Sequence, residues 1–204
     1  GYATLQFDYS GHGLSDDEVI SRESQIEDLQ AASGWLADQG FTNQLIHGHS
    51  FGSVTALAAR LSHATALFLS EPVLGPLSYD WSAIFSSNQL DELEHTGRTW
   101  IPDDSEGPRE SFVISKQTLA DLSMVDPGII DPSGAPVLIL HDADDIELDL
   151  VDLTRDAFPR LPDGSRVELI HETSFGAGEH PEILREAALE WAQLWAEPSG
   201  EFRQ

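Results

Sequence analysis

Short apolar runs alternate along this chain with longer amphipathic ones, a pattern typical of the strands and helices of a parallel sheet. The apolar runs predict five strands, at residues 2–7, 44–47, 66–69, 136–140 and 167–170. The third and fourth runs are almost wholly apolar, as in strands that helices cover on both faces. We therefore expect an α/β fold with a mostly parallel sheet flanked by helices.

Helices are predicted between most of these strands, over about residues 24–39, 53–61, 148–158 and 183–195. The first should open at Ser24, because a serine followed three residues later by a glutamate, Glu27, is typical of a capping box. Its inward stripe consists of four apolar residues, Ile26, Leu29, Ala32 and Leu36. Gly40 should end this helix.

The alternation of strand and helix breaks between about Val73 and Gly134. Prolines and aromatic residues are frequent in this insertion, which predicts an irregular or helical excursion rather than a further sheet unit. Excursions of this length are seldom structureless, and covers over active sites are a common use for them. We expect a single α/β domain over residues 1–204, with residues 73–134 as a cap or lid.

Acidic residues outnumber basic ones by 36 to 10 over the 204 residues, which gives a formal charge of −26. The acids are spread through the whole length, and Lys116 is the only lysine. A surface this acidic repels itself at low salt and is tolerated when concentrated ions shorten the range of the repulsion. The composition suggests a salt-loving host, with ordinary acidic solubility as the alternative.

Charge and composition also exclude several classes of protein. Nucleic acid and anionic lipid are not expected as partners, because binding either requires a basic surface. The chain has no cysteine, so disulfides and thiolate metal sites are excluded. No apolar run approaches the roughly 20 residues that cross a bilayer. We expect a soluble, cytoplasmic domain with no membrane span, which folds on its hydrophobic core.

The most informative string, Leu45 to Ser53, places Gly-x-Ser-x-Gly between a predicted strand and a predicted helix. A nucleophile elbow requires this context. Ser50 would take a strained backbone conformation that projects its hydroxyl above the sheet, and side chains at Gly48 and Gly52 would collide with neighbouring backbone. The dipole and N–H groups of the following helix would favour a developing negative charge. Ser50 is therefore the candidate nucleophile.

A serine hydroxyl needs a base to take its proton, and the base needs an acid to orient it. Three candidate acids, Asp142, Asp144 and Asp145, follow directly on the fourth predicted strand, where sites in open α/β sheets collect. The candidate base, His180, follows the last predicted strand after a loop and directly precedes the last predicted helix. The order serine, aspartate, histidine is the one expected for such an elbow.

Other histidines compete for the role of base. His171 is the main rival, because it lies at the end of the last predicted strand. A base on a flexible loop reaches both the serine and the acid more readily, which favours His180. His47 and His49, beside the elbow, are expected to tune packing or the pocket rim. The acids from Asp142 to Asp149 are attributed to a solvated face rather than to a cation site.

The chain resembles the α/β-hydrolase superfamily essentially from end to end. The resemblance lies in three strings and two single residues: Phe7 to Ser15, Gly48 to Gly52, Pro136 to His141, Asp145 and His180. The short cover and the segment from Phe112 to Leu122 are similar to the branch that contains the mitochondrial palmitoyl-protein thioesterase and bacterial serine-aminopeptidase-like esterases.

The roles that the resemblance implies are nucleophile for Ser50, general base for His180 and acid for Asp145. The superfamily's usual His-Gly-x-x-Asp ending aligns on His141 to Asp145, with Asp142 in place of the glycine. A shift of one residue would promote Asp144 instead. The backbone N–H of Phe51 matches one oxyanion donor, and no cofactor is implied.

The chain also departs from the superfamily. The first strands, and the loop that carries the second oxyanion donor, would lie before Gly1. Loss of one such donor costs roughly 3 to 4 kcal/mol of transition-state stabilisation, and lost strands leave a sheet edge bare. We expect either a partial sequence or a weakened enzyme.

The leading hypothesis is a serine hydrolase that cleaves a small-molecule carboxylic ester or thioester through an acyl-enzyme intermediate. The aromatic, apolar insertion indicates an uncharged acyl group, and the acidic surface disfavours anionic substrates. A peptidase or a carbon–carbon bond hydrolase would use the same machinery, whereas halide displacement would need an aspartate at position 50. A non-catalytic binding or scaffold protein of the same fold is the alternative from a different class.

Overall fold

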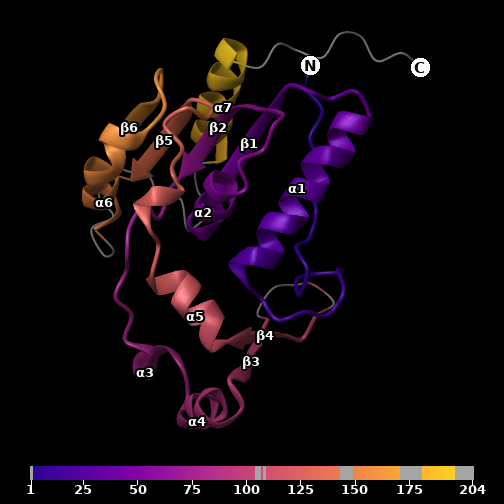
Figure 1. The fold of residues 1–204 in the computed structure, drawn as a ribbon, viewed down its shortest axis with the longest axis vertical. Helices are drawn as coiled ribbons and strands as arrows, with labels where there is room; N and C mark the ends of the chain where they lie inside the picture. The colour runs from indigo at the N-terminus through magenta and orange to yellow at the C-terminus, as the bar shows by residue number, and fades with distance from the viewer. Residues whose placement is uncertain (1, 104–106, 108, 143–148, 171–180, 196–204) are drawn as a thin grey trace.

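The computed structural model describes residues 2–103, 107, 109–142, 149–170 and 181–195 (Figure 1). Its main sheet has four parallel strands in the order β1-β2-β5-β6. Their bounds are Gln44–His49 for β1, Ala64–Ser70 for β2, Val137–Asp142 for β5 and Arg166–Ile170 for β6. Four of the five predicted strands are therefore confirmed, as is the expected α/β class.

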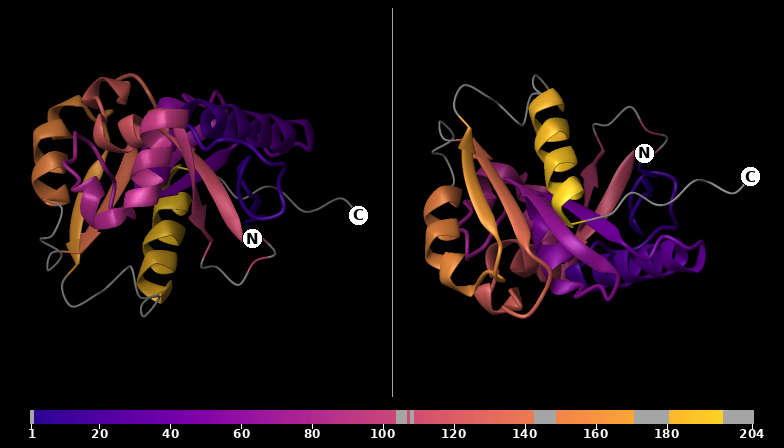
Figure 2. Two further views of the ribbon diagram at one scale, coloured as in Figure 1. Left: turned by 90° about the horizontal axis from the view of Figure 1, so that it is seen from below. Right: turned by 90° about the horizontal axis from the view of Figure 1, so that it is seen from above.

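Helices cover both faces of this sheet. Their bounds are Arg22–Asp38 for α1, Phe51–Ala58 for α2, Leu150–Ala157 for α6 and Pro181–Trp195 for α7. One face of β2 and β5 packs against α2 and α6 and presents four apolar side chains, Leu67, Leu69, Val137 and Ile139. The opposite face packs against Trp191 of α7 and presents Ala66, Phe68, Leu138 and Leu140. α7 accordingly lies on the side of the sheet away from α1 (Figure 2).

The predicted strand at residues 2–7 is wrong. These residues belong to no strand, and most of their side chains are exposed. A strand is stabilised by hydrogen bonds to a neighbouring strand, and none of the strands in the described part of the chain pairs with this segment. The turn that follows is formed, with Gly11 at a φ of 79° and the N–H of Ser10 donating to Asp28 of α1 at 2.7 Å.

The predicted start of the first helix is wrong by a few residues. α1 begins at Arg22, and its N-cap is Ser21, whose hydroxyl accepts a hydrogen bond from the N–H of Ser24 at 3.1 Å. Ser21 has the extended backbone that an N-cap needs, whereas Ser24 is already inside the first turn. The predicted apolar stripe is half-buried, and α1 ends at Asp38, before Gly40 at a φ of 94° as expected.

The insertion contains its own small sheet, which contradicts the expectation of an irregular or helical excursion. Its elements are α3 Trp81–Ile84, α4 Ser87–Thr96, β3 Arg98–Pro102, β4 Ser111–Ser115, α5 Lys116–Ser123 and a 3₁₀ turn at Pro127–Ile129. β3 and β4 pair antiparallel. Proline is tolerated in such a ribbon because Pro102 ends β3.

The hairpin of β3 and β4 is attached to the segment that leads into α1. Arg109, just before β4, donates to three groups of that segment, the carbonyl oxygens of Gly13 (3.2 Å) and Ser15 (2.5 Å) and the carboxylate of Asp17 (2.6 Å). The N–H of Ile20 donates to the carbonyl of Val113 in β4 at 3.0 Å. The insertion and this segment therefore form one connected unit beside the main sheet.

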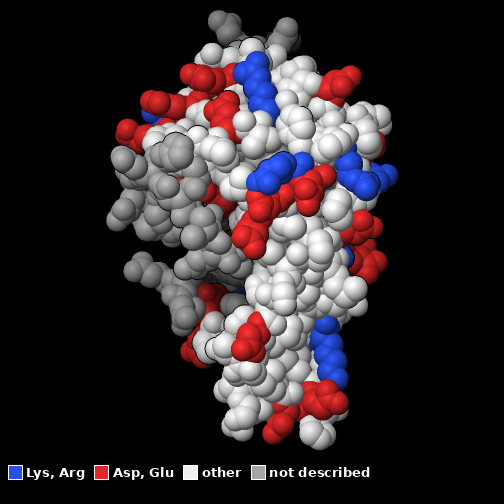
Figure 3. All heavy atoms as spheres, turned by 90° about the vertical axis from the view of Figure 1, so that its left-hand side faces the viewer, with Lys and Arg blue, Asp and Glu red and all other residues white. Residues whose placement is uncertain are grey.

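The described helices and the surface charge bear on the expected environment of the chain. None of the described helices combines the length and apolar character that a membrane crossing needs. Acidic side chains outnumber basic ones on the face shown in Figure 3, where they form several separate groups. This distribution agrees with the formal charge of −26.

Candidate active site

Ser50 occupies the turn between β1 and α2. Its φ of 49° and ψ of −120° are strained for any residue other than glycine. The backbone is held on both sides, because its N–H donates to Ser70 O at 2.9 Å and its carbonyl accepts from the N–H of Ser53 at 3.1 Å. Ser50 stands at the N-cap position of α2, yet its side chain makes no capping hydrogen bond. The half-buried hydroxyl is thus not engaged by the helix it precedes.

The two glycines of the motif have different roles. A Cβ at Gly48 would lie 2.7 Å from Gly52 O and 2.8 Å from Ser53 Cα, so β1 and α2 approach too closely for any side chain there. A Cβ at Gly52 would meet nothing within 4 Å. The prediction of steric collision is therefore confirmed for Gly48 and wrong for Gly52, whose missing side chain would point away from the contact between β1 and α2.

Ser53 connects the elbow to the start of the insertion. Its side chain is fully buried, and its hydroxyl donates to the carbonyl of Ser50 at 2.5 Å. The same oxygen accepts a hydrogen bond from the N–H of Val73 at 3.2 Å. Ser53 had no predicted role, although its place three residues after the candidate nucleophile fits the i to i−3 bonding common for serine in a first turn.

The parallel strands bring several predicted residues to one edge of the sheet. Ser50 follows β1, Asp142 ends β5, and Asp142 pairs with Ile170 at the end of β6. The predicted acid and base, with their rivals, lie outside the described residues: Asp144, Asp145, His171 and His180. α7 begins at Pro181, the next residue after His180.

No protein-family model matches the chain, and no curated protein sequence matches it. Solved structures do match. The esterase domain of a Rhodothermus marinus protein superposes with a TM-score of 0.58 at 19% identity, over 83% of this chain and 69% of that one. The monoacylglycerol lipase of Paleococcus ferrophilus superposes with a TM-score of 0.61 at 18% identity, over 92% of this chain and 80% of that one. Est1E of Butyrivibrio proteoclasticus, solved with ferulic acid bound, superposes with a TM-score of 0.61 at 18% identity, over 92% of this chain and 75% of that one.

This chain has the α/β-hydrolase fold. The turn from β1 to α2 joins a strand to a helix, which is the context that a Gly-x-Ser-x-Gly nucleophile elbow requires. Phe51 is the first residue of α2, and the first N–H groups of an α-helix have no acceptor within the helix. The helix dipole adds partial positive charge at the same end. The backbone N–H of Phe51 therefore remains the candidate oxyanion donor.

Two imidazoles of this α/β-hydrolase fold converge on one hydroxyl beside the elbow. The Oγ of Ser70, which is fully buried, lies 3.1 Å from Nε2 of His47 and 3.0 Å from Nδ1 of His49. A hydroxyl has a single proton to donate, so at least one ring donates to it. The ring of His47 also stacks on Phe68 with centroids 4.9 Å apart. Both histidines are otherwise exposed, and whether they tune packing or the pocket rim stays a prediction.

The environment also changes the titration of His47. Desolvation of the ring lowers the pKa of His47 from its ordinary value, and the neighbouring His49 imidazole lowers it further. A lowered pKa means that the fold disfavours the protonated ring. The elbow is therefore flanked by a histidine that the folded chain holds neutral more readily than the unfolded chain does.

A buried polar network that the sequence analysis missed lies at the same edge. Glu71 follows β2 with a φ of 47°, and its Oε2 lies 3.0 Å from Nδ1 of His141. Its Oε1 accepts a hydrogen bond from the N–H of Asp142. The Nε2 of His141 lies 2.7 Å from the hydroxyl of Thr154 in α6. The network fixes the end of β5, three residues before Asp145. The one sign of the network in the sequence is Glu71, an acid directly after the apolar run of β2.

The insertion packs beside the start of α2. Val54 of α2 clusters with Val73 and Val125, both from the insertion, and Phe51 packs against this cluster. A cavity of about 60 Å³ lies next to Phe51, between the first turn of α1 and Leu122 of α5. Part of the insertion is therefore a neighbour of the candidate nucleophile.

The described residues do not present a metal centre. No group of three or more histidine or acidic side chains gathers among them in a way that could hold an ion. The acids of the run from Asp142 to Asp149 fall mostly outside the described residues.

Proposed function

We propose that this chain is a serine hydrolase that cleaves carboxylic esters or thioesters of small molecules. The conformation of Ser50 is the observation that carries the proposal. An ordinary N-cap serine has an extended backbone and bonds its hydroxyl to the first turn of the helix, whereas Ser50 has a φ of 49° and no such bond. Strain of this kind persists where the surrounding structure holds it, and it concentrates at functional sites.

The proposed reaction uses three side chains and one backbone group. The hydroxyl of Ser50 attacks the acyl carbonyl while His180 takes its proton, and the N–H of Phe51 stabilises the oxyanion. His180 then gives the proton to the leaving group, and Asp145 holds the ring of His180 in the productive orientation. Water, activated by the same base, releases the acyl group from Ser50. No cofactor takes part in these steps.

The positions of the described strands support this assignment of base and acid. β5 ends at Asp142, three residues before Asp145, and α7 begins directly after His180. Because β1, β5 and β6 are parallel, all three strands end at the edge of the sheet where Ser50 lies. Asp144 is the alternative acid and His171 the alternative base.

The insertion at residues 73–134 is proposed as the cap of this site. Its contact with Phe51 supports that position. It carries a row of stacked rings, Tyr79, Trp81 and Phe85, with successive centroids 4.7 and 5.7 Å apart. Aromatic surface favours an uncharged acyl group, and the net charge of −26 disfavours an anionic one. Among the solved structures of the same fold, an esterase domain and a monoacylglycerol lipase also favour ester cleavage.

Covalent labelling by a fluorophosphonate probe tests the nucleophile. We expect labelling of the native chain and none of Ser50→Ala, with the exposed Ser62→Ala as the matched control that still reacts. Labelling that survives Ser50→Ala would remove Ser50 from this role. If the native chain neither reacts with the probe nor turns over a short p-nitrophenyl ester at high salt, a binding or scaffold protein is the correct function.

The same ester assay assigns the acid and the base. Removal of the orienting charge from the acid of a serine triad lowers kcat about 10⁴-fold. We expect that loss for Asp145→Asn and little change for Asp144→Asn, and the reverse result would assign the acid to Asp144. His180→Ala should abolish turnover, whereas His171→Ala should retain it.

A further inference from the structure

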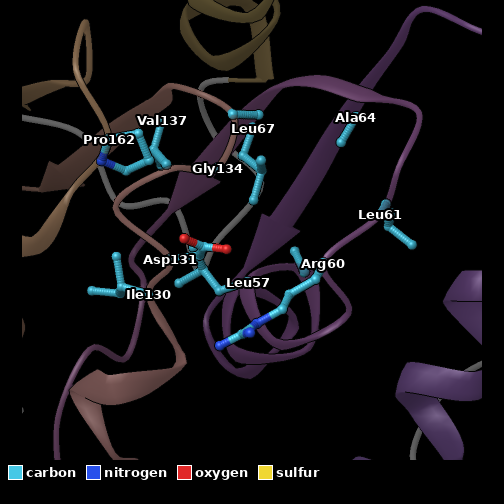
Figure 4. A pocket seen from close by; sticks show the side chains of 12 residues that line it. Leu57, Arg60, Leu61, Ala64, Leu67, Ile130, Asp131, Gly134, Val137 and Pro162 are labelled. Atoms are coloured by element: carbon cyan, nitrogen blue, oxygen red, sulfur yellow. The ribbon is translucent and has the colours of Figure 1, made fainter.

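A second pocket lies at the edge of the sheet opposite Ser50. It has a volume of about 140 Å³ and is lined at the amino ends of β2 and β5 and at the end of α2 (Figure 4). Ser50 precedes the first residue of α2, and Arg60 lies just beyond its last, so roughly 15 Å of backbone separates the two along the helix axis. The pocket is therefore distinct from the candidate active site.

The inside of this pocket is apolar and well buried. Its walls include Leu57 of α2, Leu67 of β2, Val137 of β5 and Ile130, each less than a tenth exposed. An apolar cavity of about 150 Å³ accommodates a molecule the size of benzene. The space thus suits a compact branched or aromatic side chain and is too small for a long acyl chain.

Two opposite charges line the same pocket. Arg60 carries a positive φ of 46°, and its exposed side chain extends from the end of α2 toward the side lined by Ile130 (Figure 4). Within the described residues, Arg60 makes no close ion pair. Asp131 is the negative partner. Its Oδ1 accepts from the N–H of Ser133 at 2.9 Å and from the hydroxyl of Ser133 at 2.7 Å.

The carboxylate of Asp131 is both oriented and ionised. The hydrogen bonds from Ser133 lower its pKa from the ordinary value, and the positive charge of Arg60 lowers it slightly further. Because Ser133 occupies one carboxylate oxygen, the other oxygen remains for a ligand. The pocket therefore presents the carboxylate of Asp131 and the guanidinium of Arg60 beside apolar walls.

We propose that this pocket binds an α-amino acid with a compact apolar side chain, of which leucine is the model. The side chain would fill the space among Leu57, Leu67 and Val137. The α-carboxylate would pair with the guanidinium of Arg60, which matches it in a planar, two-point contact. The α-ammonium would pair with Asp131.

Charge complementarity favours an α-amino acid over a carboxylic acid, an amine or a neutral molecule of the same shape. A carboxylic acid of the same shape would leave Asp131 beside an anion, and an amine would leave Arg60 beside a cation. A neutral molecule would satisfy neither charge. A zwitterion places one charge against each, and the net charge of −26 further disfavours a simple anion.

Isothermal titration calorimetry with L-leucine tests the proposal on the full chain. We expect saturable binding, with 4-methylpentanoate, 3-methylbutylamine and glycine each binding at least about tenfold more weakly, because each lacks one of the three contacts. Arg60→Gln and Asp131→Asn should weaken leucine binding by a similar factor. Arg98→Gln, an exposed arginine on β3, is the matched control and should bind as the native chain does.

Two further variants separate this pocket from the proposed active site. Ala64→Leu fills the pocket from the start of β2 and should remove binding, with thermal unfolding as the check that the variant folds. Ser50→Ala should bind leucine unchanged, whatever its effect on ester cleavage. No binding to the native chain, equal binding of 4-methylpentanoate, or unchanged binding by Arg60→Gln would overturn the proposal.

Discussion

Glu71 and His141 form a buried pair at the carboxyl edge of the sheet, with Oε2 3.0 Å from Nδ1, although 70 residues separate them in the chain. The side chain of His141 is fully buried and that of Glu71 is 10% exposed. Water does not reach the ring, so its two nitrogens rely on Glu71 and on the hydroxyl of Thr154 for polar contacts.

Removal of both partners should destabilise the chain by less than the sum of the two single removals. Glu71→Ala and His141→Ala are each expected to lower the free energy of unfolding by about 1 to 3 kcal/mol, because each leaves one buried polar atom of the other residue without its partner. The double variant should lose clearly less than the sum of the two. Urea denaturation followed by circular dichroism measures all three, and additive losses would show that the pair is not coupled. The exposed pair of Lys116 and Glu94 is the control, and its removal should change little.

The two glycines of the elbow should respond differently to the same substitution. Gly48→Ala is expected to destabilise the chain by about 1 to 3 kcal/mol, because its Cβ would lie 2.7 Å from Gly52 O. Gly52→Ala should be neutral or stabilising by up to about 1 kcal/mol, since it replaces glycine in a helix without a clash. Thermal unfolding of both variants checks the difference, and equal losses would contradict the close approach of β1 and α2.

Acid should destabilise the chain partly through His47. Its pKa is lower in the folded chain than in the unfolded one, so the unfolded state binds more protons as the pH falls below the ordinary histidine value. Stability is therefore present above about pH 6.5 and declines as the pH falls through the folded pKa. His47→Gln keeps a polar group near Ser70 without titrating, and its stability should depend less on pH over this interval. An unchanged pH dependence would remove His47 from the effect, and Gln substitution of the exposed His95 is the control.

Salt should stabilise the chain by screening its acidic surface. With a formal charge of −26, raising NaCl from low concentration to about 1 M shortens the Debye length to about 3 Å and should raise the melting temperature. Sucrose at equal osmolality stabilises proteins by exclusion rather than by screening, so it serves as the control. A sucrose effect as large as that of NaCl would show that charge repulsion is not the cause.

Local patterns were sufficient to predict the parts of the fold whose causes are local. The apolar runs of β2 and β5 predicted strands covered on both faces, and Gly48 predicted the tight turn before Ser50, because the collision it avoids involves residues only four and five positions away. The strand at residues 2–7 failed because a strand exists only through its neighbour. The hairpin of β3 and β4 was missed for the same reason, since its pairing joins residues as far as 17 apart, Arg98 and Ser115.

In the candidate site too, features set by a local motif could be predicted, and features that join separate elements could not. The strained turn at Ser50 could be predicted from the motif and its context, whereas the network of Glu71, His141 and Thr154 could not, because it joins three separate elements. The roles of Ser50, Phe51, Asp145 and His180 stay predictions, to be tested by the labelling experiment and the ester assay. Ser70 was missed because a serine that ends an apolar strand gives no sign that two imidazoles converge on it.

Arg109 limits how the insertion can rearrange. Its guanidinium holds Gly13, Ser15 and Asp17 at once, so the β3–β4 hairpin cannot swing away from the sheet unless the residues leading into α1 travel with it. Among the described residues, α3 and α4 make no comparable set of contacts with the main sheet, so that end of the insertion could shift without the residues that lead into α1.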